Sequence, residues 1–170
     1  MKRSTPAALD LRELPVLALF AALMVAVQVA MAGLPNIELV TLLTILVTVH
    51  LGWKAMFSTA VFVILEGLLY GFGIWWFNYI YVWPILVCLT MALRRFSHPV
   101  LWTTVAGVYG LMFGTLCSAP YFLTGGWAAG VSYIAAGIPY DITHCIGNLV
   151  STALLFYPLD RVLTRCLKQA

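Results

Sequence analysis

The chain is a succession of long apolar stretches separated by short groups of Gly, Pro and charged residues. A helix needs about 20 apolar residues to cross the hydrocarbon core of a bilayer. With Pro, Gly and charge taken as breaks, the pattern predicts six such helices. We expect them at residues 15–33, 37–51, 55–73, 78–93, 99–123 and 139–165. The sequence therefore predicts an all-α integral membrane protein, a bundle of six transmembrane helices.

Two breaks in this pattern carry further expectations. Pro84 lies inside the predicted fourth helix, where a missing backbone donor should kink the helix or split off an interfacial turn. The Gly- and Ala-rich residues 124–138 are expected to form the longest loop, before the last helix.

The composition supports the membrane class. Hydrophobic residues make up 63% of the chain and charged residues only 9%, whereas a soluble domain carries about 25% charged residues. At 170 residues, six spans leave little chain for any extramembrane module.

The basic residues predict the orientation. Once the predicted helices alternate across the membrane, every Lys and Arg falls on one side, and the opposite loops at 34–36, 74–78 and 124–138 have none. The residues concerned are Lys2, Arg3, Arg12, Lys54, Arg94, Arg95, Arg161, Arg165 and Lys168. The positive-inside rule therefore places both termini in the cytoplasm, with residues 1–14 as a cytoplasmic tail and 15–166 as the transmembrane domain.

Three acidic residues lie away from this basic side: Glu38, Glu66 and Asp141. Glu66 is expected roughly 16 Å above the cytoplasmic start of its helix, at 1.5 Å per residue. A carboxylate inside a span is costly and usually faces a cavity or a partner, so Glu66 is a candidate functional residue. The alternative is a protonated Glu bonded to a neighbouring helix. Glu38 and Asp141 could instead cap helix N-termini.

Other polar and aromatic residues are expected at the same level as these acids. They are Asn36 before the second helix, Asn78 and Tyr79 at the start of the fourth, with Trp75, Trp76 and Trp83 nearby, and His144 and Asn148, which share one face of the last helix with Asp141. Aromatic walls with a few polar anchors are typical of a small-molecule pocket. An ordinary interfacial belt of aromatic residues is the alternative.

The sequence gives little support to a catalytic site or a metal site. Asp141 and His144 form a lone D-x-x-H pair without further ligands, and there is no HExxH, GxSxG or Walker lysine. We expect no enzyme activity, no metal, no cofactor and no nucleic-acid partner.

Small residues form a ridge on the first helix. Ala18, Ala22, Ala26 and Ala30 repeat every four residues, a spacing that lets two membrane helices approach closely. This ridge suits docking of another subunit or packing inside the chain. For a weaker ridge on the fifth helix, Gly110, Gly114 and Ser118, internal packing is expected.

Three stretches carry a resemblance to a known family: residues 34–40, residues 66–73 with Trp75 and Trp76, and residues 137–141 with His144. Over nearly its whole length the chain resembles the substrate-binding S components of energy-coupling factor (ECF) transporters, in particular members whose substrate is unassigned. These are six-helix proteins that capture vitamins for prokaryotic ABC importers in the plasma (inner) membrane. The resemblance implies that residues 15–166 form a transmembrane substrate-binding domain.

The resemblance also implies partners and a site. It implies a pocket near the extracellular face, lined by Asn36, Glu38, Glu66, Trp75, Trp76, Asn78, Tyr79, Asp141, His144 and Asn148. It further implies that Ala18, Ala22, Ala26 and Ala30 contact the transmembrane T component, which couples the chain to two ATPase subunits. The connection between the first two helices is shorter than in many relatives, so gating is expected from residues 124–138.

The charge pattern bears on the substrate. With no Lys or Arg near the expected pocket, nothing would neutralise a carboxylate-rich or phosphorylated ligand. A neutral or cationic heterocycle is expected instead. Two alternatives stay open: a stand-alone secondary transporter that couples protons through Glu66, and a membrane enzyme that uses Asp141 and His144.

Overall fold

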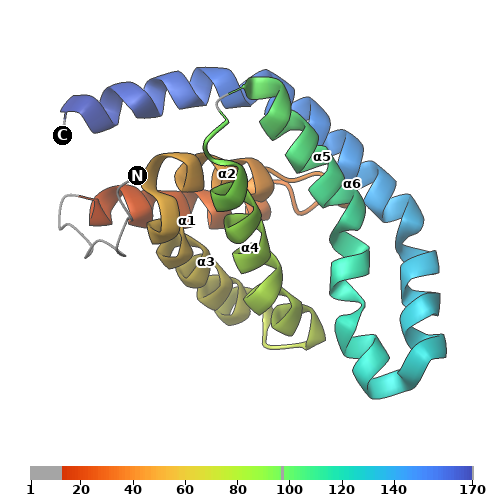
Figure 1. Cartoon of the computed structure of the whole chain (residues 1–170). Coiled ribbons are helices and arrows are strands. Elements are labelled where there is room, and N and C mark those ends of the chain that lie inside the picture. The colour runs from red at the N-terminus through yellow and green to blue at the C-terminus, as the bar shows by residue number, and fades with distance from the viewer. Residues whose placement is uncertain (1–12, 97, 170) are drawn as a thin grey trace.

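The computed structural model describes residues 13–96 and 98–169. All regular structure in this part of the chain is helical, as the sequence predicts. The elements are α1 (Leu14–Ala30), α2 (Val40–Leu51), the 3₁₀ turn η1 (Gly52–Lys54), α3 (Ala55–Tyr70), α4 (Ile74–Leu93), α5 (Pro99–Cys117) and α6 (Ala119–Gln169) (Figure 1).

Four segments are long and apolar enough to cross a membrane: Val40–Tyr70, Ile74–Leu93, Pro99–Cys117 and Ala119–Leu167. The first contains α2 and α3 with η1 between them, and α1 is a shorter apolar helix. The chain is therefore an all-helical, multi-pass membrane protein. Six crossings and cytoplasmic termini stay predictions, because α2 alone has 12 residues and would reach only about 18 Å.

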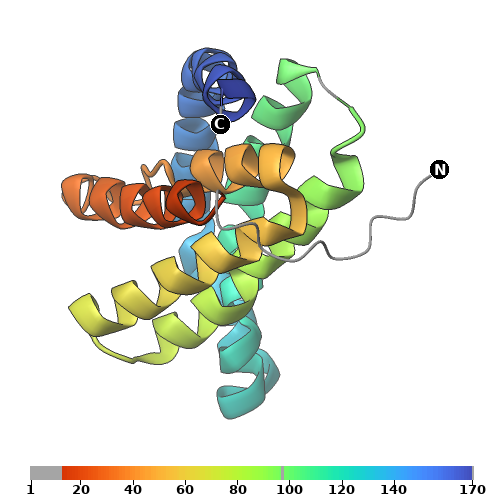
Figure 2. The ribbon, with the colours of Figure 1, turned by 90° about the vertical axis from the view of Figure 1, so that its left-hand side faces the viewer.

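The core is built around α2. Every residue from Val40 to Thr48 is buried, and α2 contacts α1, α3, α4, α5 and α6. A helix that is apolar all round has no face suited to water, so it is covered on all sides by other helices. Figure 2 shows α2 near the centre, with α3 and α4 running side by side below it.

Glycines allow α5 and α6 to pack closely. A Cβ atom added at Gly110 would lie 2.9 Å from the carbonyl oxygen of His144, and one at Gly114 would lie 2.5 Å from Asp141 Oδ2. The expectation that small residues on this helix serve internal packing is confirmed at both positions.

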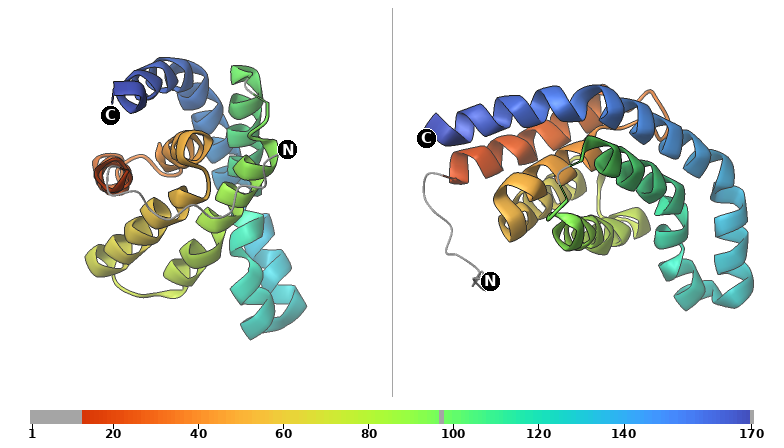
Figure 3. Two further views of the ribbon diagram at one scale, coloured as in Figure 1. Left: turned by 60° about the vertical axis from the view of Figure 1, so that its left-hand side comes forward. Right: turned by 45° about the horizontal axis from the view of Figure 1, so that its top comes forward.

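The predicted loop at 124–138 is wrong. α6 is helical across this region, and within it only Gly126 has non-helical angles, with φ 73° and ψ −171°. The rings of Tyr121 and Tyr133 stack at 4.1 Å, so the segment folds on itself as a helical hairpin. Figure 3 shows this hairpin extending away from the other helices. The segment is thus helical although its glycines suggest a loop.

Helix ends also differ from expectation by a few residues. α1 ends at Ala30 and α3 at Tyr70, where Gly71 takes a φ of 86°. α4 begins at Ile74 and continues as one helix through Pro84, so no separate interfacial turn forms there.

The two ends of the bundle differ in their polar contacts. At one end Lys54 pairs with Glu13, and His50 lies 2.9 Å from Asp160. Arg94 lies against Gly52 at this same end. The start of α1 and the end of α6 are also close together there (Figure 3). The other end carries the 31–39 connection, whose Asn36 Nδ2 donates to the carbonyl of Tyr140 at 3.2 Å. The candidate site lies at this second end.

Candidate functional site

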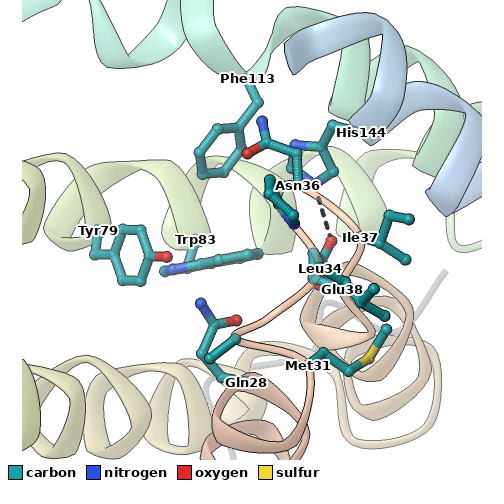
Figure 4. Close-up of a pocket in the computed structure, with 12 residues that line it drawn as sticks. Gln28, Met31, Leu34, Asn36, Ile37, Glu38, Tyr79, Trp83, Phe113 and His144 are labelled. Carbon is teal, nitrogen blue, oxygen red and sulfur yellow. Dashed lines mark hydrogen bonds and ion pairs between the residues drawn. The ribbon is translucent and has the colours of Figure 1, made fainter.

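A cavity of about 170 Å³, chamber A, lies between the 31–38 connection and helices α4, α5 and α6. Figure 4 shows the side chains that line it. Its polar lining comes from Gln28, Asn36, Glu38 and His144, and its aromatic lining from Tyr79, Trp83 and Phe113. Asn36 has a φ of 57°, a left-handed conformation that Asn tolerates better than most residues, and this turn directs the connection back over the bundle.

Glu38 and His144 form the main polar contact of chamber A. Glu38 Oε1 lies 3.0 Å from His144 Nε2, and Glu38 Oε2 accepts the backbone N–H of Thr41 at 2.8 Å. Burial opposes ionisation of the Glu38 carboxyl, but the hydrogen bonds with His144 and Thr41 outweigh it and hold its pKa below the usual range. Glu38 therefore both caps the start of α2 and joins the connection to α6.

The aromatic wall of chamber A is a chain of ring contacts. The rings of Tyr79 and Trp83 meet edge to face, with their centroids 5.5 Å apart. The centroid of the Phe113 ring lies 5.9 Å from that of Trp83 and 4.8 Å from that of His144. Within the described part of the chain, Trp83 Nε1 and His144 Nδ1 are buried without a hydrogen-bond partner. Buried polar atoms are nearly always paired, so both are positioned to bind a ligand or water.

A second cavity, chamber B, has a volume of about 250 Å³ and is lined by Gln28, Ala32, Glu66, Tyr70, Trp75 and Tyr79. Gln28, Ala32 and Tyr79 line both cavities, so chambers A and B adjoin. Glu66 is only 2% exposed, and its Oε1 has no hydrogen-bond partner among the described residues. The two chambers share lining residues and both contain aromatic side chains.

The structure brings six of the predicted site residues to these chambers. Asn36, Glu38 and His144 line chamber A, Glu66 and Trp75 line chamber B, and Tyr79 lines both.

The other four predicted site residues line neither chamber and have partners within the chain. Trp76 Nε1 donates to the carbonyl of Val63 at 2.8 Å, and Asn78 Oδ1 accepts from the Tyr81 hydroxyl at 2.9 Å.

The remaining two of these residues, on α6, bind α5. Asp141 Oδ1 accepts the N–H of Gly114 at 2.8 Å, and Asn148 Nδ2 donates to the carbonyl of Ala106 at 3.3 Å. The three polar residues on this face of α6 therefore have different roles. His144 points into chamber A, while Asp141 and Asn148 hold α6 against α5.

The predicted site did not include Gln28, Tyr70, Trp83 or Phe113, which also line the chambers. Gln28 is the only polar side chain in the α1 sequence, and a lone amide in an apolar span is itself a signal for a site. Phe113 has no such signal, because its position beside His144 depends on how α5 and α6 pack.

The alanine ridge points away from the bundle. Ala18, Ala22, Ala26 and Ala30 are all exposed, whereas Leu17, Ala21 and Met24 on the other face of α1 are buried. The ridge is therefore not used for packing between the described helices, and it is open to another membrane helix or to lipid.

The chambers contain groups that can bind a small molecule. Residues 13–96 and 98–169 contain no group of three or more His, Cys, Asp or Glu that could hold a metal ion. Carboxylates, an imidazole, an indole N–H and aromatic faces remain, and these groups bind rings and hydrogen-bond donors. Searches for similar proteins found no matching family model, curated protein or solved structure.

Proposed function

We propose that the chain is the substrate-capturing membrane subunit of an ECF-type ABC importer in the plasma (inner) membrane of a prokaryote. Its substrate is a vitamin or a related small heterocyclic micronutrient. The observation that carries the proposal is the pair of adjoining chambers lined by Glu66, Trp83 and His144, each of which has a buried polar atom without a hydrogen-bond partner among the described residues.

In this proposal six helices cross the membrane, both termini are cytoplasmic and the chambers open near the extracellular face. Two features support this orientation. Lys54 and Arg94 lie at one end of the bundle, where the positive-inside rule expects the cytoplasm. The chambers lie at the opposite end, beside the 31–38 connection.

The exposed alanines of α1 support a partner subunit. A ridge of small side chains on a membrane-facing helix lets a second helix come close, and Ala18, Ala22, Ala26 and Ala30 are all exposed. In the proposed complex this ridge contacts the T component, which joins the chain to two ATPase subunits. The chain itself carries no Walker lysine motif, which fits an energy source on other subunits.

The lining supports a neutral or cationic substrate. No described residue that lines either chamber is Lys or Arg, so an anionic group would be desolvated there without a countercharge from this part of the chain. Aromatic faces and carboxylate oxygens instead suit a ring with hydrogen-bond donors.

Native mass spectrometry of the detergent-purified protein tests the proposal. We expect a small heterocycle to be released from the wild type and from Trp127→Phe, a control at an exposed position of the α6 hairpin, and to be lost from His144→Ala. ATP-dependent uptake of that molecule should require co-expressed T and ATPase subunits. Uptake without these subunits, or equal ligand loading in His144→Ala, would contradict the proposal.

A second candidate function rests on Glu66, whose buried Oε1 has no partner among the described residues. Such a carboxylate inside a span is a typical proton carrier, so a stand-alone proton-coupled transporter would use it. Proteoliposomes that hold only this chain distinguish the two. Uptake driven by a pH gradient, and abolished in Glu66→Gln, would favour the proton-coupled function.

A further inference from the structure

The two carboxylates of the site differ in what surrounds them. Both oxygens of Glu38 have partners, in His144 and Thr41. Glu66 is 2% exposed, and Oε1 has no partner in the described part of the chain. A buried ionised carboxylate needs a countercharge or several donors to offset its desolvation. Glu66 is therefore the position at which a ligand can supply the missing partner.

The walls around Glu66 are aromatic. Tyr70, Trp75 and Tyr79 line chamber B with it, and the rings of Trp75 and Tyr79 meet edge to face at 5.3 Å. The face of an aromatic ring carries negative charge and attracts a cation within about 6 Å of its centroid. Three rings around one carboxylate give chamber B a negative electrostatic character.

Among the described residues, those that line chamber B include no Lys, Arg or His. Its other lining residues are Gln28 and Ala32, both from the end of α1 and the turn after it. His144, the only imidazole in the combined lining, belongs to chamber A and is engaged by Glu38. A cation in chamber B would thus be attracted by Glu66 and would not be repelled by a positively charged lining residue.

The two chambers can hold different parts of one ligand, a charged group in chamber B and an uncharged part in chamber A. Chamber B, at about 250 Å³, accommodates a compact charged group such as a methylated ammonium or a ring with a quaternary nitrogen. Chamber A continues from it past Gln28 and Tyr79 to the Trp83 indole. The uncharged remainder of the same ligand would lie against this indole.

We propose that the substrate is an organic cation and that its positively charged nitrogen binds in chamber B, between the Glu66 carboxylate and the rings of Tyr70, Trp75 and Tyr79. This inference rests on the proposed binding function and narrows its substrate class from neutral or cationic compounds to cationic ones.

Paired probes of equal shape test the charge requirement. Choline and 3,3-dimethyl-1-butanol differ in a quaternary nitrogen against a quaternary carbon, and their binding to the full chain in nanodiscs is followed by tryptophan fluorescence and calorimetry. We expect the wild type to bind choline at least about 10-fold more tightly than the alcohol. Glu66→Gln should remove this preference, because it keeps the shape of the side chain and deletes its charge.

Asp160→Asn is the matched control, since it deletes a carboxylate at the opposite end of the bundle, where Asp160 contacts His50 and lines neither chamber, and it should keep the preference for choline. Size-exclusion elution and melting temperature show that both variants are folded. Equal binding of the two probes to wild type would overturn the inference, as would a preference that survives in Glu66→Gln. Absence of choline binding up to about 100 mM would also overturn it.

The outcomes separate this inference from the proposed function. A neutral heterocycle that co-purifies with the chain and needs the ATPase subunits for uptake would refute the cation site alone. Choline selectivity that depends on Glu66, in a chain that never associates with a T component, would keep the cation site and refute the importer.

Discussion

Some polar residues in this protein join helices and others line the chambers, and sequence position alone does not separate the two groups. Asp141 and His144 are one turn apart on α6, yet Asp141 binds the N–H of Gly114 while His144 faces chamber A. Glu38 does both, since it accepts the N–H of Thr41 at the start of α2 and lines chamber A beside His144. The contacts of each side chain therefore decide its use.

The Glu38 contacts should make stability depend on pH. Its folded-state pKa lies below the usual 4.5 because hydrogen bonds from His144 and Thr41 outweigh burial. The stability that these contacts give is complete above the unfolded-state pKa of the Glu38 carboxyl. It is lost as the pH falls through the lower folded-state pKa of the same group. We expect Glu38→Gln to lower the melting temperature at pH 7 and to differ less from wild type near pH 3. An equal difference at both pH values would contradict this account.

The glycines between α5 and α6 should tolerate no side chain. In Gly114→Ala the new Cβ would lie 2.5 Å from Asp141 Oδ2, so we expect a loss of about 1–3 kcal/mol in unfolding free energy. Gly33→Ala is the control, because nothing lies within 4 Å of a Cβ there, and it should change stability by less than about 0.5 kcal/mol. Unfolding in mixed micelles measures both, and equal effects would refute the packing argument.

At the scale of elements, α1 has two faces with different tasks. Leu17, Ala21 and Met24 pack against the bundle, while the alanine ridge stays exposed. Its C-terminal end adds Gln28 to both chambers. One helix thus joins the proposed partner surface to the proposed binding site.

Bulk on the ridge should disrupt assembly and spare binding. We expect Ala22→Leu or Ala26→Leu to abolish co-purification with the T component, because close helix approach requires small side chains. Val108→Phe adds bulk at an exposed position of another helix, α5, and should retain the complex. Ligand binding should be normal in all three variants. Intact complexes with Ala22→Leu and Ala26→Leu would show that the partner binds elsewhere.

The hairpin of α6 shows where element prediction failed. Residues 124–138 contain glycines that favour a loop, but the stacked rings of Tyr121 and Tyr133 hold the segment as paired helices with a break at Gly126. The expectation that these residues gate the site as a loop loses its basis. By contrast, the starts at 55 and 99 agree with the structure, because Pro and charge mark them locally.

At the scale of the whole molecule, the bundle has a basic end and a chamber end. The first is marked by the Glu13–Lys54 pair and by Arg94 beside Gly52, the second by the Asn36–Tyr140 contact. This polarity is the basis of the proposed orientation.

Cysteine labelling tests the orientation directly. In a variant without native cysteines, Phe72→Cys and Phe96→Cys place single thiols at exposed positions of the two ends. An impermeant maleimide should label Phe72→Cys in intact cells and Phe96→Cys only after permeabilisation. Labelling of both in intact cells, or the reverse pattern, would contradict cytoplasmic termini.

The sequence by itself determined the membrane class, the helical fold and the positions of most helices, because these depend on local hydropathy and on Pro, Gly and charge. It also singled out Glu66 and His144 as candidate site residues, since polar residues are rare in apolar spans. Only the tertiary structure decided that Asp141 and Asn148 join helices, that Gln28, Trp83 and Phe113 complete the chambers, and that 124–138 is a hairpin. These outcomes depend on which helix faces which, and that is set by packing between residues far apart in the chain.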